Sequence, residues 1–177
     1  MARRLPILIL GAVVLLAGCG GKSTEEELVE VSNTSGIQRM KIEELAKKGV
    51  PAIQPLLKSK KMTVRLAAIG ALGFLKKNPE ATQLLVGVAK GDQDEEAYFA
   101  IIALARQRAG EAKAVIEEAM KSKVARRRQA ACIAIAEYGD EALYPLIIKA
   151  AQDRDRGVAK TAQSTARRCK IEEALEE

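Results

Sequence analysis

The stretch that decides the fold runs from Val64 to Gly73 and reads Val-Arg-Leu-Ala-Ala-Ile-Gly-Ala-Leu-Gly. Its apolar residues recur at intervals of three and four, which places them on one face of an α-helix. Similar segments follow in the chain, and the alanines that align them are spaced 32, 31 and 31 residues apart: Ala68, Ala100, Ala131 and Ala162. Self-similarity at a fixed period predicts a repeat protein.

A second segment recurs after each of these helices. Three copies begin at Pro79, Gly110 and Asp140, and an earlier copy runs from Pro51 to Leu57 after a weaker first helix around residues 37–48. Each unit is therefore expected to be a helix, a short turn rich in Gly, Asn or Asp, and a second helix. Stacked units of this kind bury one continuous core between neighbours.

Gly70 and Gly73 interrupt a sequence that otherwise favours helix, at a cost of about 1 kcal/mol each relative to alanine. We interpret them as positions where a neighbouring helix approaches closely. A phosphate-binding loop is the alternative, but these glycines lie inside a predicted helix with no strand before it.

The composition favours closely packed helices. Aromatic residues make up 3% of the chain, tryptophan is absent, and hydrophobic residues reach 48%. The core must therefore consist of Ala, Leu, Ile and Val, which suits an all-α fold better than a sheet. The formal charge of +6 falls to +4 without Arg3 and Arg4, and this mild surplus does not predict nucleic-acid binding.

The repeat resembles the short HEAT-like repeats named after the phycobilisome lyases, whose first helix carries a Val-Arg-x-x-Ala-x-x-Ala-Leu-Gly core. The second repeat matches this core, whereas the third has Glu96-Ala97 and the fourth Arg127-Arg128 in place of Val-Arg. The resemblance implies a right-handed α-solenoid of about five HEAT-like helix pairs, with residues 170–177 as a polar closing helix. Tetratricopeptide and ankyrin repeats are disfavoured because their signature residues are missing.

The N-terminus resembles the signal peptide of bacterial lipoproteins. Arg3 and Arg4 precede an apolar run from Leu5 to Ala17, which is shorter than the roughly 20 apolar residues of a membrane-spanning helix. The run ends in a lipobox: Leu16, Ala17, Gly18 and Cys19. The resemblance implies cleavage before Cys19 and lipid on its thiol. The alternative is an ordinary signal peptide or short anchor with a chance cysteine.

This interpretation divides the chain into a cleaved signal peptide (1–18), a lipidated flexible tether (19–35) and a repeat domain (36–177). Two or three acyl chains hold a protein durably at a membrane, whereas one binds only marginally. A flexible tether of this length reaches about 20 Å, so the repeats work close to the membrane. Gly20 stands where Asp would retain an enterobacterial lipoprotein at the inner membrane. We therefore expect an exported chain at the cell envelope, with the outer membrane favoured in a Gram-negative host.

Two further cysteines, Cys132 and Cys169, remain beside the lipidated one. Export permits a disulfide between them. However, Cys169 falls about six residues later in its helix, which would separate the sulfurs by roughly 9 Å. We expect two thiols, with Cys132 buried among small residues.

Three consecutive arginines, Arg126, Arg127 and Arg128, begin the first helix of the fourth repeat, where positive charge opposes the helix dipole. In the alignment Glu95 and Glu96 fall beside Arg126 and Arg127. We therefore favour a ladder of salt bridges between repeats. The alternative is that the three arginines contact an anion or a lipid headgroup.

The second helices are expected to carry the partner-binding surface, because in HEAT proteins they usually line the concave side. Once their apolar residues face the core, the residues left pointing outward are Gln54, Lys58, Gln83, Glu111, Glu117 and Tyr144. An exposed Tyr144 would be an interface anchor. The equal alternative is that it packs between helices with its hydroxyl in water.

Catalytic machinery is hard to find in this chain. It has no histidine, so it lacks Ser-His and Cys-His pairs and imidazole metal ligands. Adjacent carboxylates such as Glu117 and Glu118 diverge on a helix. We expect a non-enzymatic scaffold or accessory subunit, without cofactor, that holds an unknown envelope protein at the membrane. The alternative, by family analogy, is a lyase or chaperone that binds a chromophore or another small molecule.

Overall fold

The computed structural model describes residues 35–174, in which all regular secondary structure is helical. The elements form five successive pairs. The first helices of the pairs are α2 (Ser35–Lys47), α4 (Met62–Phe74), α6 (Asp94–Gln107), α8 (Ala125–Tyr138) and α10 (Arg156–Cys169). Their second members are α3 (Val50–Ile53) with the 3₁₀-helix η1 (Gln54–Lys58), α5 (Pro79–Lys90), α7 (Gly110–Met120), η2 (Glu141–Leu143) with α9 (Tyr144–Ala150), and η3 (Glu172–Ala174).

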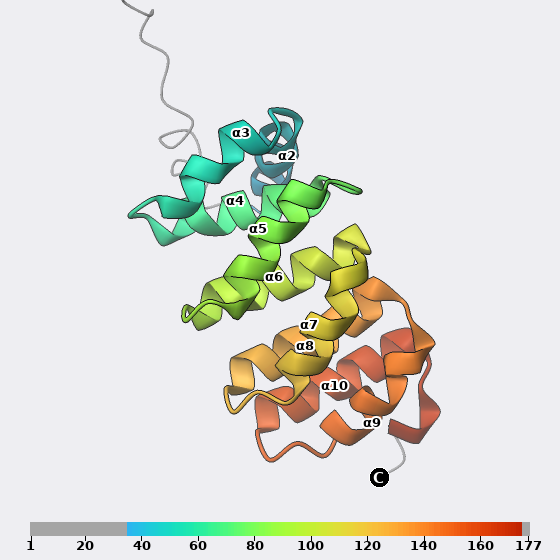
Figure 1. Cartoon of the computed structure of the whole chain (residues 1–177). Coiled ribbons are helices and arrows are strands. Elements are labelled where there is room, and N and C mark those ends of the chain that lie inside the picture. The colour runs from blue at the N-terminus through green and yellow to red at the C-terminus, as the bar shows by residue number, and fades with distance from the viewer. Residues whose placement is uncertain (1–34, 175–177) are drawn as a thin grey trace, which may run out of the picture.

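The pairs follow one another from the blue end to the red end of the molecule in Figure 1. Each first helix packs against the first helix of the next pair. The helices α4, α6, α8 and α10 begin 32, 31 and 31 residues apart, which are the spacings of the aligned alanines. The prediction of an all-α solenoid of about five helix pairs is thus confirmed, while its right-handed sense stays a prediction.

The core runs without interruption from Leu45 to Ala174 and consists mainly of alanine, leucine, isoleucine and valine. The four alanines that aligned the repeats are all fully buried: Ala68, Ala100, Ala131 and Ala162. Short side chains at these positions let neighbouring helices approach closely. The period in the sequence therefore marks the buried seam between first helices.

Gly70 and Gly73 lie on α4 where neighbouring first helices meet it. A Cβ atom on Gly73 would lie 3.0 Å from the Cβ of Ala103 on α6. On Gly70 it would lie 3.4 Å from Ile42 on α2. The close-approach interpretation is therefore confirmed, because the space that a phosphate would need is filled by packed side chains.

The turns that follow the first helices contain a residue with positive φ at a strict period. These residues are Lys77, Arg108, Gly139 and Lys170, with φ of 57°, 53°, 74° and 59°. Their spacing is 31 residues throughout, and the turns lie along one edge of the molecule in Figure 1. Only one of the four is glycine, the residue that this conformation favours.

The C-terminal end of the solenoid is polar. The outer side of α10 exposes Lys160, Ser164, Arg167 and Arg168, as a terminal repeat requires. After α10 the chain forms η3 and buries Ile171 and Ala174. The predicted closing helix at 170–177 is therefore a single 3₁₀ turn as far as residue 174, and α10 supplies most of the polar cap. The signal peptide and nearly all of the predicted tether lie outside the described residues.

Candidate functional site

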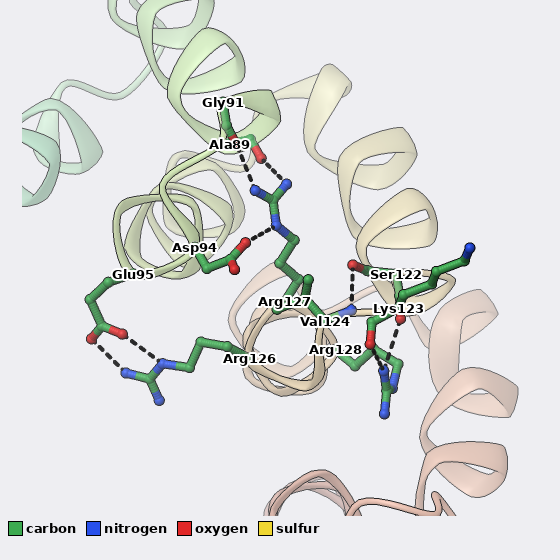
Figure 2. Close-up of polar contacts among 10 residues, drawn as sticks. All are labelled: Ala89, Gly91, Asp94, Glu95, Ser122, Lys123, Val124, Arg126, Arg127 and Arg128. Carbon is green, nitrogen blue, oxygen red and sulfur yellow. Dashed lines mark hydrogen bonds and ion pairs between the residues drawn. The ribbon is translucent and has the colours of Figure 1, made fainter.

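The arginines at the start of α8 point in three different directions, as Figure 2 shows. Arg126 reaches Glu95 on α6 through two hydrogen bonds, Nε to Oε2 at 2.9 Å and Nη2 to Oε1 at 2.7 Å. Its guanidinium carbon also lies 3.6 Å from the centre of the Tyr98 ring. A paired carboxylate and an aromatic face together satisfy this cation.

Arg127 binds the preceding repeat in a different way. Its Nε donates to Oδ1 of Asp94 at 2.7 Å, and its terminal nitrogens donate to the carbonyl oxygens of Ala89 and Gly91 (Figure 2). These carbonyls lie at the C-terminal end of α5, where the helix dipole is negative. Arg127 is therefore a C-terminal cap supplied by the next repeat.

Arg128 is buried and ties two loops together. Its Nη1 donates to the carbonyl oxygens of Ser122 at 2.9 Å and Lys123 at 3.2 Å, in the loop before α8. Its Nε and Nη2 each donate to Asp153, in the loop before α10, at 2.8 Å. The Arg128 and Asp153 side chains are only 10% and 15% exposed. This pair therefore joins the fourth repeat to the fifth.

The hydrogen bonds with arginine hold the pKa of Glu95 and of Asp153 below the usual carboxyl range. Positive charge at the start of α8 is thus compensated by carboxylates and helix-end carbonyls, and the predicted inter-repeat ladder is confirmed. Its register differs by one residue, since Arg127 pairs with Asp94 rather than Glu96. The anion or headgroup contact of Arg126, Arg127 and Arg128 stays a prediction, and such a ligand would have to compete with these carboxylates.

Further rungs of the ladder follow the repeat period. Arg65 on α4 donates to Glu96 on α6 at 2.8 Å, across 31 residues. Glu137 on α8 accepts from Arg106 at 3.4 Å and from Arg168 at 3.3 Å, each also 31 residues away. Opposite charges at exactly one repeat spacing are a signal that sequence reasoning could have used. The two Glu137 contacts are exposed, so each contributes little to stability.

A buried glutamine holds the second and third repeats together and was not anticipated. Gln107 at the end of α6 donates from Nε2 to the carbonyl oxygens of Leu72 at 2.7 Å and Leu75 at 3.2 Å. Its Oε1 accepts from the Thr82 hydroxyl at 2.9 Å. It therefore caps the end of α4 and binds α5. Nothing in its sequence context distinguishes it from an exposed glutamine at a helix end.

The second helices present most of the predicted partner-binding residues to solvent. Gln54, Lys58, Gln83 and Glu111 are exposed, and Glu117 is half-buried. The side chains between them are short, since Gly87, Ala114 and Pro145 are also exposed. These residues and the four exposed predicted ones define what we call the second-helix surface.

Tyr144 is half-buried and packs against the core, so the structure favours the packing alternative over an exposed anchor. Its pKa is raised by burial and by the neighbouring Cys169 and Glu141. Cys132 and Cys169 are both free thiols, as expected. Cys132 is buried, and burial raises its pKa to about 12. A thiol with so high a pKa is a poor nucleophile at neutral pH.

The remaining predicted site residues are the lipobox positions Leu16, Ala17, Gly18 and Cys19, which lie outside the described range. Between residues 35 and 174 the helices are all too short or too polar to cross a membrane. The same part of the chain contains no cluster of three His, Cys, Asp or Glu side chains placed to hold a metal ion.

Comparison with known proteins agrees with this architecture. A family model described as HEAT repeats matches residues 26–97, so the chain contains a HEAT repeat region. The match begins inside the stretch that the sequence analysis assigned to the tether, and it does not distinguish the phycobilisome-lyase type from other HEAT repeats. No curated protein matches the chain. The fold thus defines an all-α solenoid with HEAT-like packing, a class that suggests a protein-interaction scaffold in general.

Proposed function

We propose that the chain is a lipid-anchored scaffold of the bacterial cell envelope that binds a protein partner through its second-helix surface. One observation carries the choice of surface. The arginines of the first helices are engaged within the solenoid, whereas Gln54, Gln83 and Glu111 are exposed and form no hydrogen bond or ion pair with other residues of the range 35–174.

The second-helix surface is also continuous from pair to pair. Gln83, Ala114 and Pro145 occupy equivalent positions on α5, α7 and α9, 31 residues apart, and all three are exposed. Uncharged, short side chains in this row would let a partner approach the helices closely. Charged residues such as Glu111 and Lys58 would form the polar rim that protein interfaces usually have.

The membrane anchor rests on the lipobox that ends at Cys19. Cleavage and acylation there would fix the chain to the envelope, with the outer membrane favoured because Gly20 follows the lipid site. No contact within the described residues favours a chromophore or another small molecule, so we propose neither a lyase activity nor a cofactor.

Site-specific photo-crosslinking in cells tests the proposed surface. A photoreactive amino acid is placed at Gln83 or Glu111 on the second helices, and at Thr63 or Lys160 on the first helices as controls, since all four side chains are exposed. We expect one dominant envelope protein to be crosslinked from Gln83 and Glu111 but not from the controls. Equal crosslinking from all four positions, or from the controls alone, would overturn the assignment of the surface.

A further inference from the structure

Charge is distributed unevenly along the solenoid. Residues 35–78 contain ten lysines and arginines but only two acidic residues, whereas residues 79–174 contain 16 basic and 15 acidic residues. The basic excess of the described chain therefore belongs to its first two repeats, the blue to green end of Figure 1.

Most of this excess consists of exposed lysines, which we call the lysine pole: Lys47, Lys48, Lys58, Lys60, Lys61, Lys76 and Lys77. None of them forms an ion pair with a carboxylate of residues 35–174. The arginines of α8 differ in this respect, because each of them has a carboxylate partner. The lysine pole is thus the uncompensated positive surface of the solenoid.

Helix stability does not account for this placement. Lysines after α2 and α4 interact favourably with the negative ends of those helices. Lys60 and Lys61, however, precede α4, where positive charge opposes the dipole. Lys77 has a φ of 57°, a conformation that favours glycine over lysine. Positive charge is therefore present at positions where local structure favours other residues.

The lysine pole is also the part of the solenoid nearest to the proposed anchor. Sixteen residues separate Cys19 from the start of α2 at Ser35, and a chain of that length spans at most about 55 Å. Anionic headgroups attract lysines within a Debye length, about 8 Å at physiological ionic strength. Lipidated proteins commonly combine acyl chains with a basic patch of this kind.

We propose that the lysine pole docks onto the anionic lipid headgroups of the membrane that holds the anchor, an inference that rests on the proposed function. Docking would bring the first two repeats to the membrane and leave the later second helices accessible to a partner. The headgroup contact is thereby assigned to lysines of the first two repeats instead of Arg126, Arg127 and Arg128.

Lysine footprinting on vesicles tests this proposal with the full-length lipidated protein. The protein is reconstituted on vesicles of phosphatidylcholine, with or without about one third phosphatidylglycerol, and acylated with an amine-reactive reagent. Mass spectrometry then gives the labelling rate of each lysine. We expect pole lysines to react about threefold or more slowly on the anionic vesicles and to recover in about 1 M salt, where the Debye length is roughly 3 Å. Lys149 and Lys160, exposed in the last two repeats, should react equally throughout.

Paired variants sharpen the result. Replacement of Lys47, Lys48, Lys60 and Lys61 by Gln should abolish the protection of Lys58, Lys76 and Lys77. Replacement of the distal lysines 121, 123, 149 and 160 by Gln should leave it intact. Equal labelling on both kinds of vesicle would overturn the proposal, as would protection that occurs only in native membranes, which would indicate an acidic protein. A chain that leaves neutral vesicles lacks the lipid anchor, so the proposed function would fail separately from the footprint.

Discussion

Arg128 and Asp153 form two parallel hydrogen bonds of 2.8 Å between α8 and the loop before α10, with both side chains largely buried. The same guanidinium binds the loop before α8 through the carbonyls of Ser122 and Lys123. One side chain thus fixes the loops on both sides of the fourth helix pair. Because neighbouring repeats are the only contacts that a solenoid has, such links determine how cooperatively it unfolds.

Replacement of Arg128 by Met should lower the free energy of unfolding by about 3 kcal/mol, because Asp153 is left buried without its partner. Denaturant unfolding measures this loss. The matched control is Arg154→Met, an exposed arginine nearby, which should cost less than about 0.5 kcal/mol. The double variant Arg128→Met/Asp153→Leu should recover about half of the loss, and equal effects of the two single variants would contradict the assigned link.

Acid should weaken the ladder. The pKa of Asp153 is lowered by its hydrogen bonds with Arg128, so in acid the unfolded chain binds more protons than the folded chain. This contribution to stability is complete above the unfolded carboxyl pKa, about 3.9. It is lost as the pH falls through the lower folded pKa. The urea midpoint of Asp153→Asn should therefore fall less steeply below about pH 4 than that of the unmodified protein, and an identical slope would refute the prediction.

Two glycine-to-alanine substitutions should have opposite signs. In Gly73→Ala the new Cβ meets Ala103 at 3.0 Å, so overpacking of about 1–3 kcal/mol exceeds the gain in helix propensity of about 1 kcal/mol. In Gly87→Ala on α5 nothing lies within 4 Å, and the propensity gain remains. Thermal unfolding should show a lower midpoint for the first variant and a higher one for the second. A higher midpoint for both would mean that α4 and α6 do not approach closely.

The positive-φ turns make a similar pair of predictions. Lys77→Gly should stabilise the chain by about 0.5–1 kcal/mol, because lysine is disfavoured at a φ of 57°. Gly139→Ala should destabilise it by about 1 kcal/mol for the same reason. Unfolding midpoints in urea measure both changes, and two changes of the same sign would count against a shared turn conformation.

Repetition explains why the architecture could be predicted from the sequence. The aligned alanines gave the spacing of the first helices, and Gly73 indicated a close approach that the structure contains. The pairing of Arg126 with Glu95 also followed from the alignment, since equivalent positions of adjacent repeats are neighbours in space. Each of these inferences needs only the period, which is visible in a single chain.

Side-chain partners that depend on loops could not be predicted in the same way. Arg128 chose Asp153 because the loop before α10 folds back toward α8, and the repeat spacing does not reveal this path. Gln107 is buried because α4 ends beneath it. Tyr144 packs on the core because the second helix of its repeat begins as a 3₁₀ turn and then continues as α9, a change that helical periodicity cannot show.

The central claim is that a lipid on Cys19 holds this solenoid at a membrane, and the intact mass of the mature protein tests it most directly. We predict a chain that begins at Cys19 and carries the additional mass of a diacylglycerol, with or without a third acyl chain. A Cys19→Ser variant should carry no added lipid. A mature chain that begins at another residue, or one that begins at Cys19 without lipid mass, would contradict the claim.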